Sequence, residues 1–124
     1  MKKVKIAIFA DGADIKSIKK LDKLSFVKGF TTNPSLMRKS GIKNYLDFAR
    51  KVSKIIKKKP ISLEVFSDNI QEMEKQALIL SKISNNFNIK IPITNSKGFS
   101  TAGLISKLSS IRVVSVIGEV KSPS

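Results

Sequence analysis

Residues 60–94, PISLEVFSDNIQEMEKQALILSKISNNFNIKIPIT, contain the pattern that decides the fold. Residues 61–66 and 88–93 are short runs rich in Ile, Leu, Val and Phe, a composition that is typical of strands. Between these runs, apolar residues recur every three or four positions over residues 70–83, which indicates one buried face of a helix. The segment therefore predicts a strand, a helix and a second strand.

The rest of the chain repeats this unit, so that a strand and the helix region after it occur four times before a last strand. Units of about 25 to 30 residues predict a parallel sheet with right-handed crossovers, and hence an α/β fold. No linker interrupts the pattern, so a single domain over residues 1–124 is expected. The strands are expected at residues 4–10, 26–32, 61–66, 88–93 and 111–117. The helices are expected at residues 14–24, from Pro34 onward, and at 44–58, 70–83 and 99–110.

Polar residues with capping side chains precede two of these helices. Pro34 suits a first helical turn, and Asn33 or Thr32 before it can accept a hydrogen bond from the new helix. Asp68 or Ser67 can cap the helix over residues 70–83 in the same way.

A chain of βα units forms either an open doubly wound sheet or a closed barrel. The βα turns contain neither a G-x-G-x-x-G nor a Walker A sequence, which removes the usual nucleotide-binding fingerprints of open sheets. A (β/α)8 barrel of the TIM type is therefore favoured. In such a barrel alternate strand residues fill the lumen, and catalytic groups lie near the carboxyl ends of the strands.

Ionisable residues fall on one face of the expected strands. Because side chains alternate along a strand, Asp11, Glu64 and Lys90 all lie opposite the apolar set, with Thr32 and Asn33 at the end of the second strand. We expect these residues to converge on the lumen. The apolar residues expected to pack on the helices are Ile61, Leu63 and Val65 in the third strand and Ile89, Ile91 and Ile93 in the fourth.

Each of these residues also has an ordinary structural interpretation. Asp11 can end a strand or cap a helix, and Asn33 before proline is a common turn element. Glu64 and Lys90 can neutralise each other as a buried pair, although desolvation offsets much of such an attraction. One inward charge is easily explained in this way, but three together favour a site.

A partly desolvated Lys beside carboxylates suits covalent carbonyl chemistry. Burial lowers the pKa of an amine from about 10.4 and so increases the neutral, nucleophilic form. The iminium that Lys90 would form is an electron sink for cleavage of a neighbouring carbon–carbon bond. One carboxylate would take a proton from the substrate hydroxyl, and another would serve dehydration and hydrolysis of the carbinolamine. This chemistry requires no metal and no organic cofactor.

Composition limits the alternatives. The chain has no Cys and no His, which excludes disulfides and the usual Ser/His, Cys/His and His-metal sites. The net charge of +15 invites a nucleic-acid interpretation, but Lys is spread along the helices and Trp is absent, so no nucleic-acid partner is expected. No export signal or bilayer-spanning run is found, so we expect a cytoplasmic protein without a membrane partner.

Four motifs resemble the transaldolase family and its relatives, the fructose-6-phosphate aldolases. They are IFADGADIKSI, VKGFTTNPSLMRKSG, PISLEVFSD and IKIPITNSKG, and with their flanks they cover about residues 4–108. The combination of TTNPS and KIPIT at this separation is specific. The resemblance implies a class I aldolase on a (β/α)8 barrel that transfers a dihydroxyacetone unit between sugar phosphates, as in the pentose phosphate pathway.

The resemblance also implies roles for the residues that match the motifs. Lys90 matches the Schiff-base Lys, and Asp11 matches the Asp that shuttles protons. Glu64 matches the acid/base Glu that holds a catalytic water in transaldolases. Because the aldolase relatives usually carry Gln there, Glu64 favours a transaldolase.

The substrate-binding residues that the resemblance implies come from two further motifs. Asn33, with Thr32, matches the substrate-binding pair of the Thr-Thr-Asn-Pro motif. Thr94 is implied to lie beside Lys90 and to support it.

The chain departs from the family at its carboxyl-terminal side. It stops after the fifth expected strand, before the Ser and Arg that bind the substrate phosphate in the family. Three interpretations follow from the resemblance and this length. The chain is an inactive fragment, a half-barrel completed by a second copy or another chain, or a non-catalytic sugar-phosphate-binding or scaffold protein.

Overall fold

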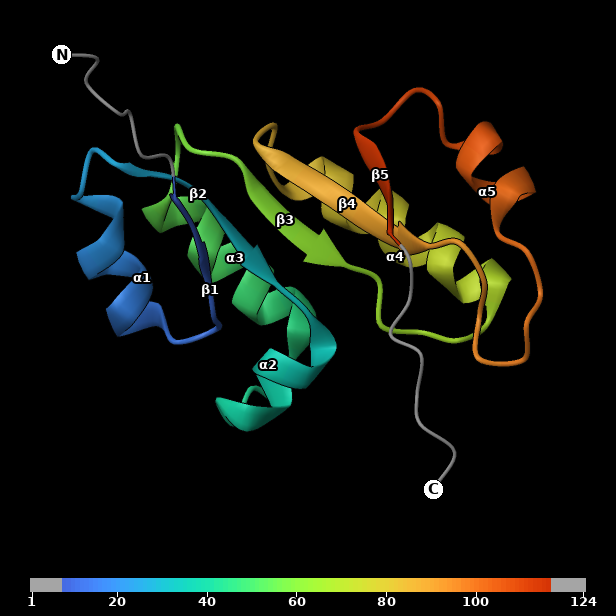
Figure 1. Cartoon of the computed structure of the whole chain (residues 1–124), viewed down its shortest axis with the longest axis horizontal. Coiled ribbons are helices and arrows are strands. Elements are labelled where there is room, and N and C mark those ends of the chain that lie inside the picture. Colours follow the sequence, from blue (N-terminus) through green and yellow to red (C-terminus); the bar gives the residue numbers. More distant parts are fainter. Residues whose placement is uncertain (1–7, 117–124) are drawn as a thin grey trace, which may run out of the picture.

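A computed structural model of the chain describes residues 8–116 and shows a five-stranded sheet with helices packed against it (Figure 1). The strands are β1 (Ile8–Asp11), β2 (Val27–Thr32), β3 (Ile61–Glu64), β4 (Phe87–Pro92) and β5 (Val113–Val116). The helices are α1 (Ile15–Asp22), α2 (Pro34–Lys39), α3 (Tyr45–Ile55), α4 (Ile70–Ile83) and α5 (Ala102–Lys107). The predicted alternation of strands and helices is confirmed, and residues 4–7 and 117 of the predicted strands lie outside the described residues.

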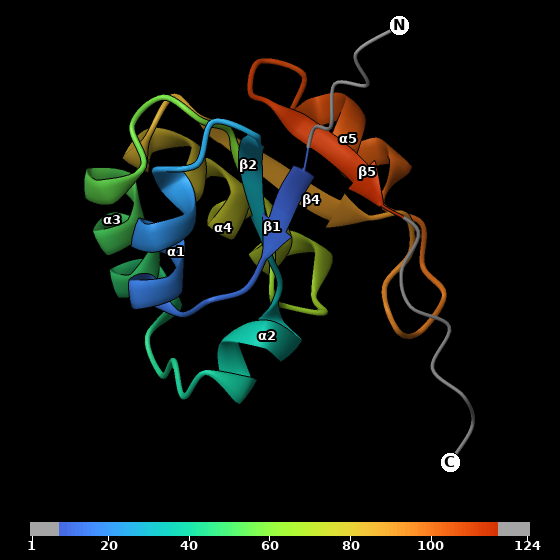
Figure 2. The same ribbon diagram turned by 60° about the vertical axis from the view of Figure 1, so that its left-hand side comes forward.

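All neighbouring strands are parallel, and their order is β1-β2-β3-β4-β5. A doubly wound sheet reverses its order at a switch point, whereas this order advances in one direction only. Right-handed crossovers then place successive helices on the same side of the sheet. Figure 2 shows α1, α3 and α4 together on one side of β1 and β2. The arrangement is that of consecutive βα units of a (β/α)8 barrel, as the sequence predicts.

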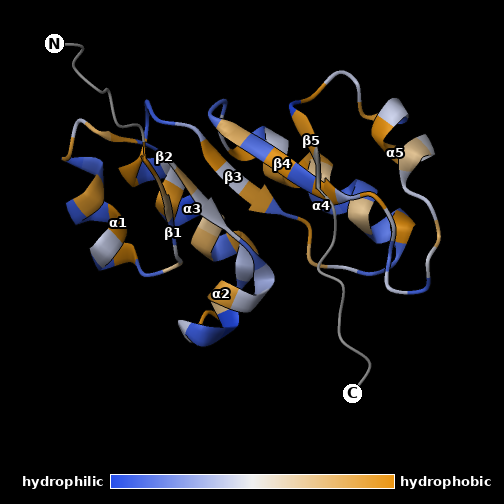
Figure 3. Ribbon diagram, viewed as in Figure 1, coloured by the Kyte–Doolittle hydropathy of each residue, from blue (hydrophilic) through white to orange (hydrophobic). Residues whose placement is uncertain are grey.

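The core lies between the sheet and the helices. Buried and half-buried positions alternate along β3 and β4, and bands of both hydropathy colours follow one another along β4 in Figure 3. Each helix buries an apolar stripe, and none within residues 8–116 is long and apolar enough to cross a bilayer. The fully buried strand residues include Leu63, Ile89 and Ile91, which face Phe48, Val52, Met73, Ala77 and Leu80 from α3 and α4.

Asn side chains cap three of the helices. The Asn33 carboxamide oxygen accepts a hydrogen bond from a backbone N–H of α2 at 2.9 Å, so Asn33 rather than Thr32 is the cap. Asn69 caps α4 in the same way, at 3.0 Å. The prediction that Asp68 or Ser67 caps this helix is therefore wrong. Asp68 lies one residue before the cap, where its carboxylate accepts hydrogen bonds from Ser96 instead.

Some predicted elements are longer than the observed ones. Helix α3 ends at Ile55, because the next residue turns to an extended backbone and buries its side chain as the chain enters β3. Strand β4 ends at Pro92, so Ile93 does not join the helix-packing face and is 44% exposed. Helix α5 is shorter than residues 99–110, because Asn95 organises the preceding residues into a loop.

Gly29 in β2 is expected to be intolerant of any side chain. A methyl group at this position would lie 2.7 Å from the Phe9 ring and 2.9 Å from the Pro60 carbonyl oxygen. The ring can rotate away, but the carbonyl belongs to the β2–β3 ladder and accepts the Phe30 N–H at 2.9 Å. Overpacking of this kind costs about 1–3 kcal/mol. We expect Gly29→Ala to lower the free energy of unfolding by that amount in urea denaturation.

Gly103→Ala is the matched control for this substitution. A methyl group at Gly103 would meet no atom within 4 Å, and Ala is the better helix former in α5. This variant should be as stable as the parent chain or slightly more stable. Equal stability of the two variants would contradict the close approach of β1, β2 and Pro60.

Candidate active site

The carboxyl ends of the strands bring the predicted site residues to one end of the molecule. In Figure 1 all connections that lead from a strand to the following helix lie along the lower side of the sheet. Asp11 and Glu64 are the last residues of β1 and β3. Active sites of parallel barrels form at this end, because side chains of neighbouring strands meet there.

Glu64 and Lys90 are neighbours across the β3–β4 ladder. The register pairs their Cα positions, and the Val65 N–H donates to the Lys90 carbonyl oxygen at 3.1 Å. Both side chains are half-buried and alternate with fully buried positions that face the helices. Both therefore lie on the face of the sheet opposite the helices, where an amine and a carboxylate can act on the same molecule.

Asp11 and Thr31 form a second pair on β1 and β2. Their Cα positions are in register, and the Thr31 hydroxyl donates a hydrogen bond to the Asp11 carboxylate. Asp11 is exposed. Strands β2 and β3 separate it from Lys90, and neighbouring strands are about 4.8 Å apart. The two pairs thus stand at opposite sides of one polar surface.

Thr32 does not belong to this surface. It is in register with Leu63 on the helix-packing face and is only 3% exposed. Its hydroxyl oxygen is buried and has no hydrogen-bond partner in the described part of the chain. The prediction that Thr32 reaches the site is wrong, because strand alternation assigns that position to Thr31 instead.

Asn33 and Thr94 lie in the loops beyond the strand ends. The Asn33 carboxamide oxygen is engaged as the cap of α2, and the side chain is half-buried. Thr94 follows the end of β4 and pairs with Ser100 across an isolated antiparallel bridge, with its side chain exposed. Asn33 therefore borders the polar surface with a fixed orientation, whereas Thr94 belongs to the β4–α5 loop.

Tyr45, the first residue of α3, contacts the end of β3 from the helix side of the sheet. The sequence did not predict that it takes part in the site. Its hydroxyl donates a hydrogen bond to the backbone carbonyl of Glu64. Its ring packs on Phe66 with a centroid distance of 4.7 Å. Burial raises the pKa of the Tyr45 phenol well above its ordinary value, and the charge of Glu64 adds to the shift. Tyr45 thus stays a protonated donor that holds the end of β3 in place.

Comparison with known proteins shows to which family the chain belongs. A family model described as "Transaldolase/Fructose-6-phosphate aldolase" matches residues 8–110. The chain belongs to this family. The match begins with β1 and extends past α5, and it therefore includes every residue of the polar surface described above.

Curated relatives extend the family assignment. The chain is 41% identical to a protein of Brucella anthropi and 44% identical to one of Bartonella quintana, each described as a probable transaldolase. Each alignment covers 86 residues, which are 69% of this chain and 39% of the relative. The chain thus spans about two fifths of the length of these transaldolase relatives.

Two polar residues share the face of the candidate site but were not predicted to belong to the site. Ser62 and Asn88 are in register with Thr31 and continue its row across β3 and β4. The alternation of strand residues places them on the right face, but neither carries a charge that draws attention to it.

No group of three or more acidic residues that could hold a metal ion occurs within residues 8–116.

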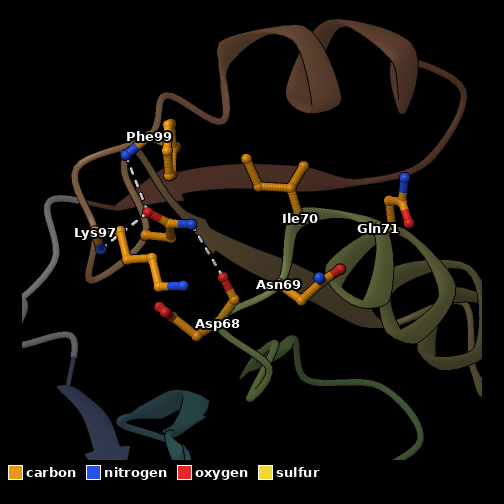
Figure 4. Close-up of a pocket in the computed structure, with 7 residues that line it drawn as sticks. Asp68, Asn69, Ile70, Gln71, Lys97 and Phe99 are labelled. Carbon is orange, nitrogen blue, oxygen red and sulfur yellow. Dashed lines mark hydrogen bonds between the residues drawn. The ribbon is translucent and has the colours of Figure 1, made fainter.

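The loops after β3 and β4, with the start of α4, line an open hollow of about 550 Å³ (Figure 4). The Asn95 amide donates to the Asp68 backbone carbonyl at 3.2 Å, and its oxygen accepts the backbone N–H groups of Lys97 and Phe99. The Ser96 N–H donates to the Asp68 carboxylate at 2.7 Å. These bonds hold together the loop that follows β3 and the loop that follows β4.

Proposed function

We propose that this chain carries the Schiff-base chemistry of a transaldolase, in which a dihydroxyacetone unit passes from a ketose phosphate to an aldose phosphate. The proposal rests above all on the pairing of Lys90 with Glu64 on the half-buried face of the sheet. Membership of the family supports it. The carboxylate beside Lys90 and the Asp11–Thr31 pair supply the proton transfers that such a reaction needs.

The first half of the reaction forms an iminium and breaks a carbon–carbon bond. The neutral Lys90 amine attacks the C2 carbonyl of the ketose, and Glu64, through a water molecule, protonates the hydroxyl that leaves as water. Asp11 then accepts the proton of the C4 hydroxyl. The C3–C4 bond breaks, its electron pair passes into the iminium to give an enamine, and the aldehyde at C4 leaves.

The second half reverses these steps with a new acceptor. The enamine carbon attacks the acceptor aldehyde, and Asp11 returns its proton to the new alkoxide. Water adds to the iminium with help from Glu64, and Lys90 is released as the free amine. Thr31 orients the Asp11 carboxylate throughout, because its hydroxyl donates to that group.

Borohydride trapping tests this proposal. The folded chain is incubated with fructose 6-phosphate or with dihydroxyacetone, reduced, and digested for mass mapping. We expect a reduced adduct on the peptide that contains Lys90, because reduction converts the iminium to a stable secondary amine. Dihydroxyacetone is included because it carries no phosphate and therefore needs no phosphate-binding residues.

The two sugars separate the alternatives. An adduct with dihydroxyacetone alone supports the Lys90 chemistry and places sugar-phosphate binding outside this chain. If a protein shown to be folded forms no adduct with either sugar, the catalytic proposal is wrong. Retained affinity for fructose 6-phosphate without any adduct would favour a non-catalytic sugar-phosphate-binding protein.

A further inference from the structure

Basic residues gather at the end of the sheet opposite the candidate active site. Helices α1, α3 and α4 run against the strands, so their last turns lie beside the amino ends of the strands. Figures 1 and 2 both show the helix-to-strand connections along the upper side of the sheet. We call this surface the basic end. Its cations are Lys19, Lys20, Lys23, Lys28, Lys54, Lys57, Lys58, Lys59, Lys82 and Arg112.

Acidic residues are almost confined to the other end. Within residues 8–116, Asp22 is the one carboxylate at the basic end, and it already pairs with Lys59 at 3.6 Å. The remaining described acids lie at strand ends, in strand-to-helix loops or in the first half of a helix. These acids are Asp11, Asp14, Asp47, Glu64, Asp68, Glu72 and Glu74. The fold therefore gathers most of the described acids away from the basic end, whereas cations lie at both ends.

The loops of the basic end are tied into one surface by two side chains. The Lys59 ammonium donates to the backbone carbonyls of Asp22 and Leu24, at 2.6 and 3.0 Å. The Asn86 amide donates to the carbonyls of Ile56 and Lys59, at 2.8 and 2.9 Å. The connections before β2, β3 and β4 are thereby held together. The exposed lysines around them extend from a fixed support.

The basic end also offers contacts other than charge. Phe26 lies between Lys23 and Lys28 and is 45% exposed, although it directly precedes β2. A hollow of about 420 Å³ opens on the same end, between the α4–β4 turn and the entry to β5. It is lined by Ser81, Ser84, Asn85, Phe87, Ser110, Ile111 and Arg112.

We propose, in place of the expectation drawn from the sequence, that the basic end binds single-stranded nucleic acid. The exposed lysines on and beside the tied loops, such as Lys20, Lys57 and Lys58, neutralise phosphodiesters, and this contact reads no sequence. The Phe26 ring offers a face on which one unpaired base stacks. The hydroxyl, amide and guanidinium groups of the hollow hydrogen-bond to another base or ribose of the same strand. Exposed lysines suit either a nucleic acid or an anionic membrane. A stacking ring and a polar hollow match unpaired bases better than they match lipid headgroups.

Fluorescence anisotropy with a labelled RNA of about 20 uridines tests the proposal, since this length exceeds the site size of most single-strand binders. The variant K20E/K57E/K58E reverses three charges at the basic end. K16E/K39E/K43E reverses three exposed charges near the opposite end and changes the net charge equally. We expect the first variant to bind at least about tenfold more weakly, with a salt slope reduced by about 2. The second should stay within about twofold of the parent chain.

A third variant tests the base contact. Phe26→Ala should weaken binding of the RNA about fivefold or more and leave the salt slope unchanged, because stacking releases no counterions. Circular dichroism checks that each variant is folded. Equal losses in the two charge variants would overturn the proposal, since net charge alone would then explain binding. The proposal would also be overturned if the folded chain showed no measurable binding to the RNA, and tight binding to phosphatidylserine vesicles would then assign the basic end to an anionic membrane.

Discussion

Ile91→Ala is expected to lower the free energy of unfolding by about 2–5 kcal/mol, which is the usual cost of removing a large aliphatic side chain from a core. Ile91 is fully buried in β4 and lies directly after Lys90. Its loss leaves a cavity between the sheet and the helices as well as removing buried apolar surface. Because small domains are stable by only about 5–15 kcal/mol, urea denaturation should show a large shift of the midpoint.

Ile79→Ala is the control for this core substitution. Ile79 lies in α4 with its side chain 42% exposed, so the same truncation removes little buried surface there. The control should change stability by about 0.5 kcal/mol or less, which is typical of a surface position. A similar loss in both variants would contradict the placement of the core between β4 and α4.

Lys90→Met is expected to abolish the borohydride-trapped adduct, reducing its yield by about a hundredfold or more, because only a primary amine forms the iminium. Met keeps an unbranched stem of similar length, so the half-buried face of β4 loses little packing. The variant should therefore stay folded. Intact mass spectrometry after incubation with dihydroxyacetone and reduction measures the yield directly.

Lys97→Met provides the matched control. Lys97 is exposed on the β4–α5 loop, and its substitution removes the same amine and the same charge a short distance away. This variant should form the adduct as the parent chain does. Persistence of the adduct in Lys90→Met would show that surface lysines react unselectively and would remove Lys90 from the mechanism.

The arrangement of elements could be predicted because local and global signals agree. Apolar residues alternate in the strand period over β3 and β4 and recur in the helix period over α4, which has the predicted bounds. The ends of other elements could not be predicted as well. A helix ends where tertiary packing requires an extended residue, as at Ile56. Helix propensity is a local property of the sequence and does not report this requirement.

The candidate site was predictable in part for a similar reason. Charged residues on apolar strands are conspicuous, and the structure brings Glu64 and Lys90 together in register. The choice between Thr31 and Thr32 depended on the phase of the alternation in β2, and the structure shows that Thr32 is the residue in register with the buried Leu63. The role of Tyr45 could not be inferred, because its partner is a backbone carbonyl that any sequence would provide.

The consecutive order of the strands has a consequence for how the chain is made. Each strand from β2 onward pairs with the strand synthesised just before it, so no strand has to wait for a distant segment. Pairing each strand with its predecessor closes a shorter loop than pairing it with a more distant strand would, which lowers the entropic cost of closure. As the chain leaves the ribosome, each βα unit can dock on the growing edge in turn. The sheet can therefore assemble in the direction of translation, and each new strand covers the edge that its predecessor left unpaired.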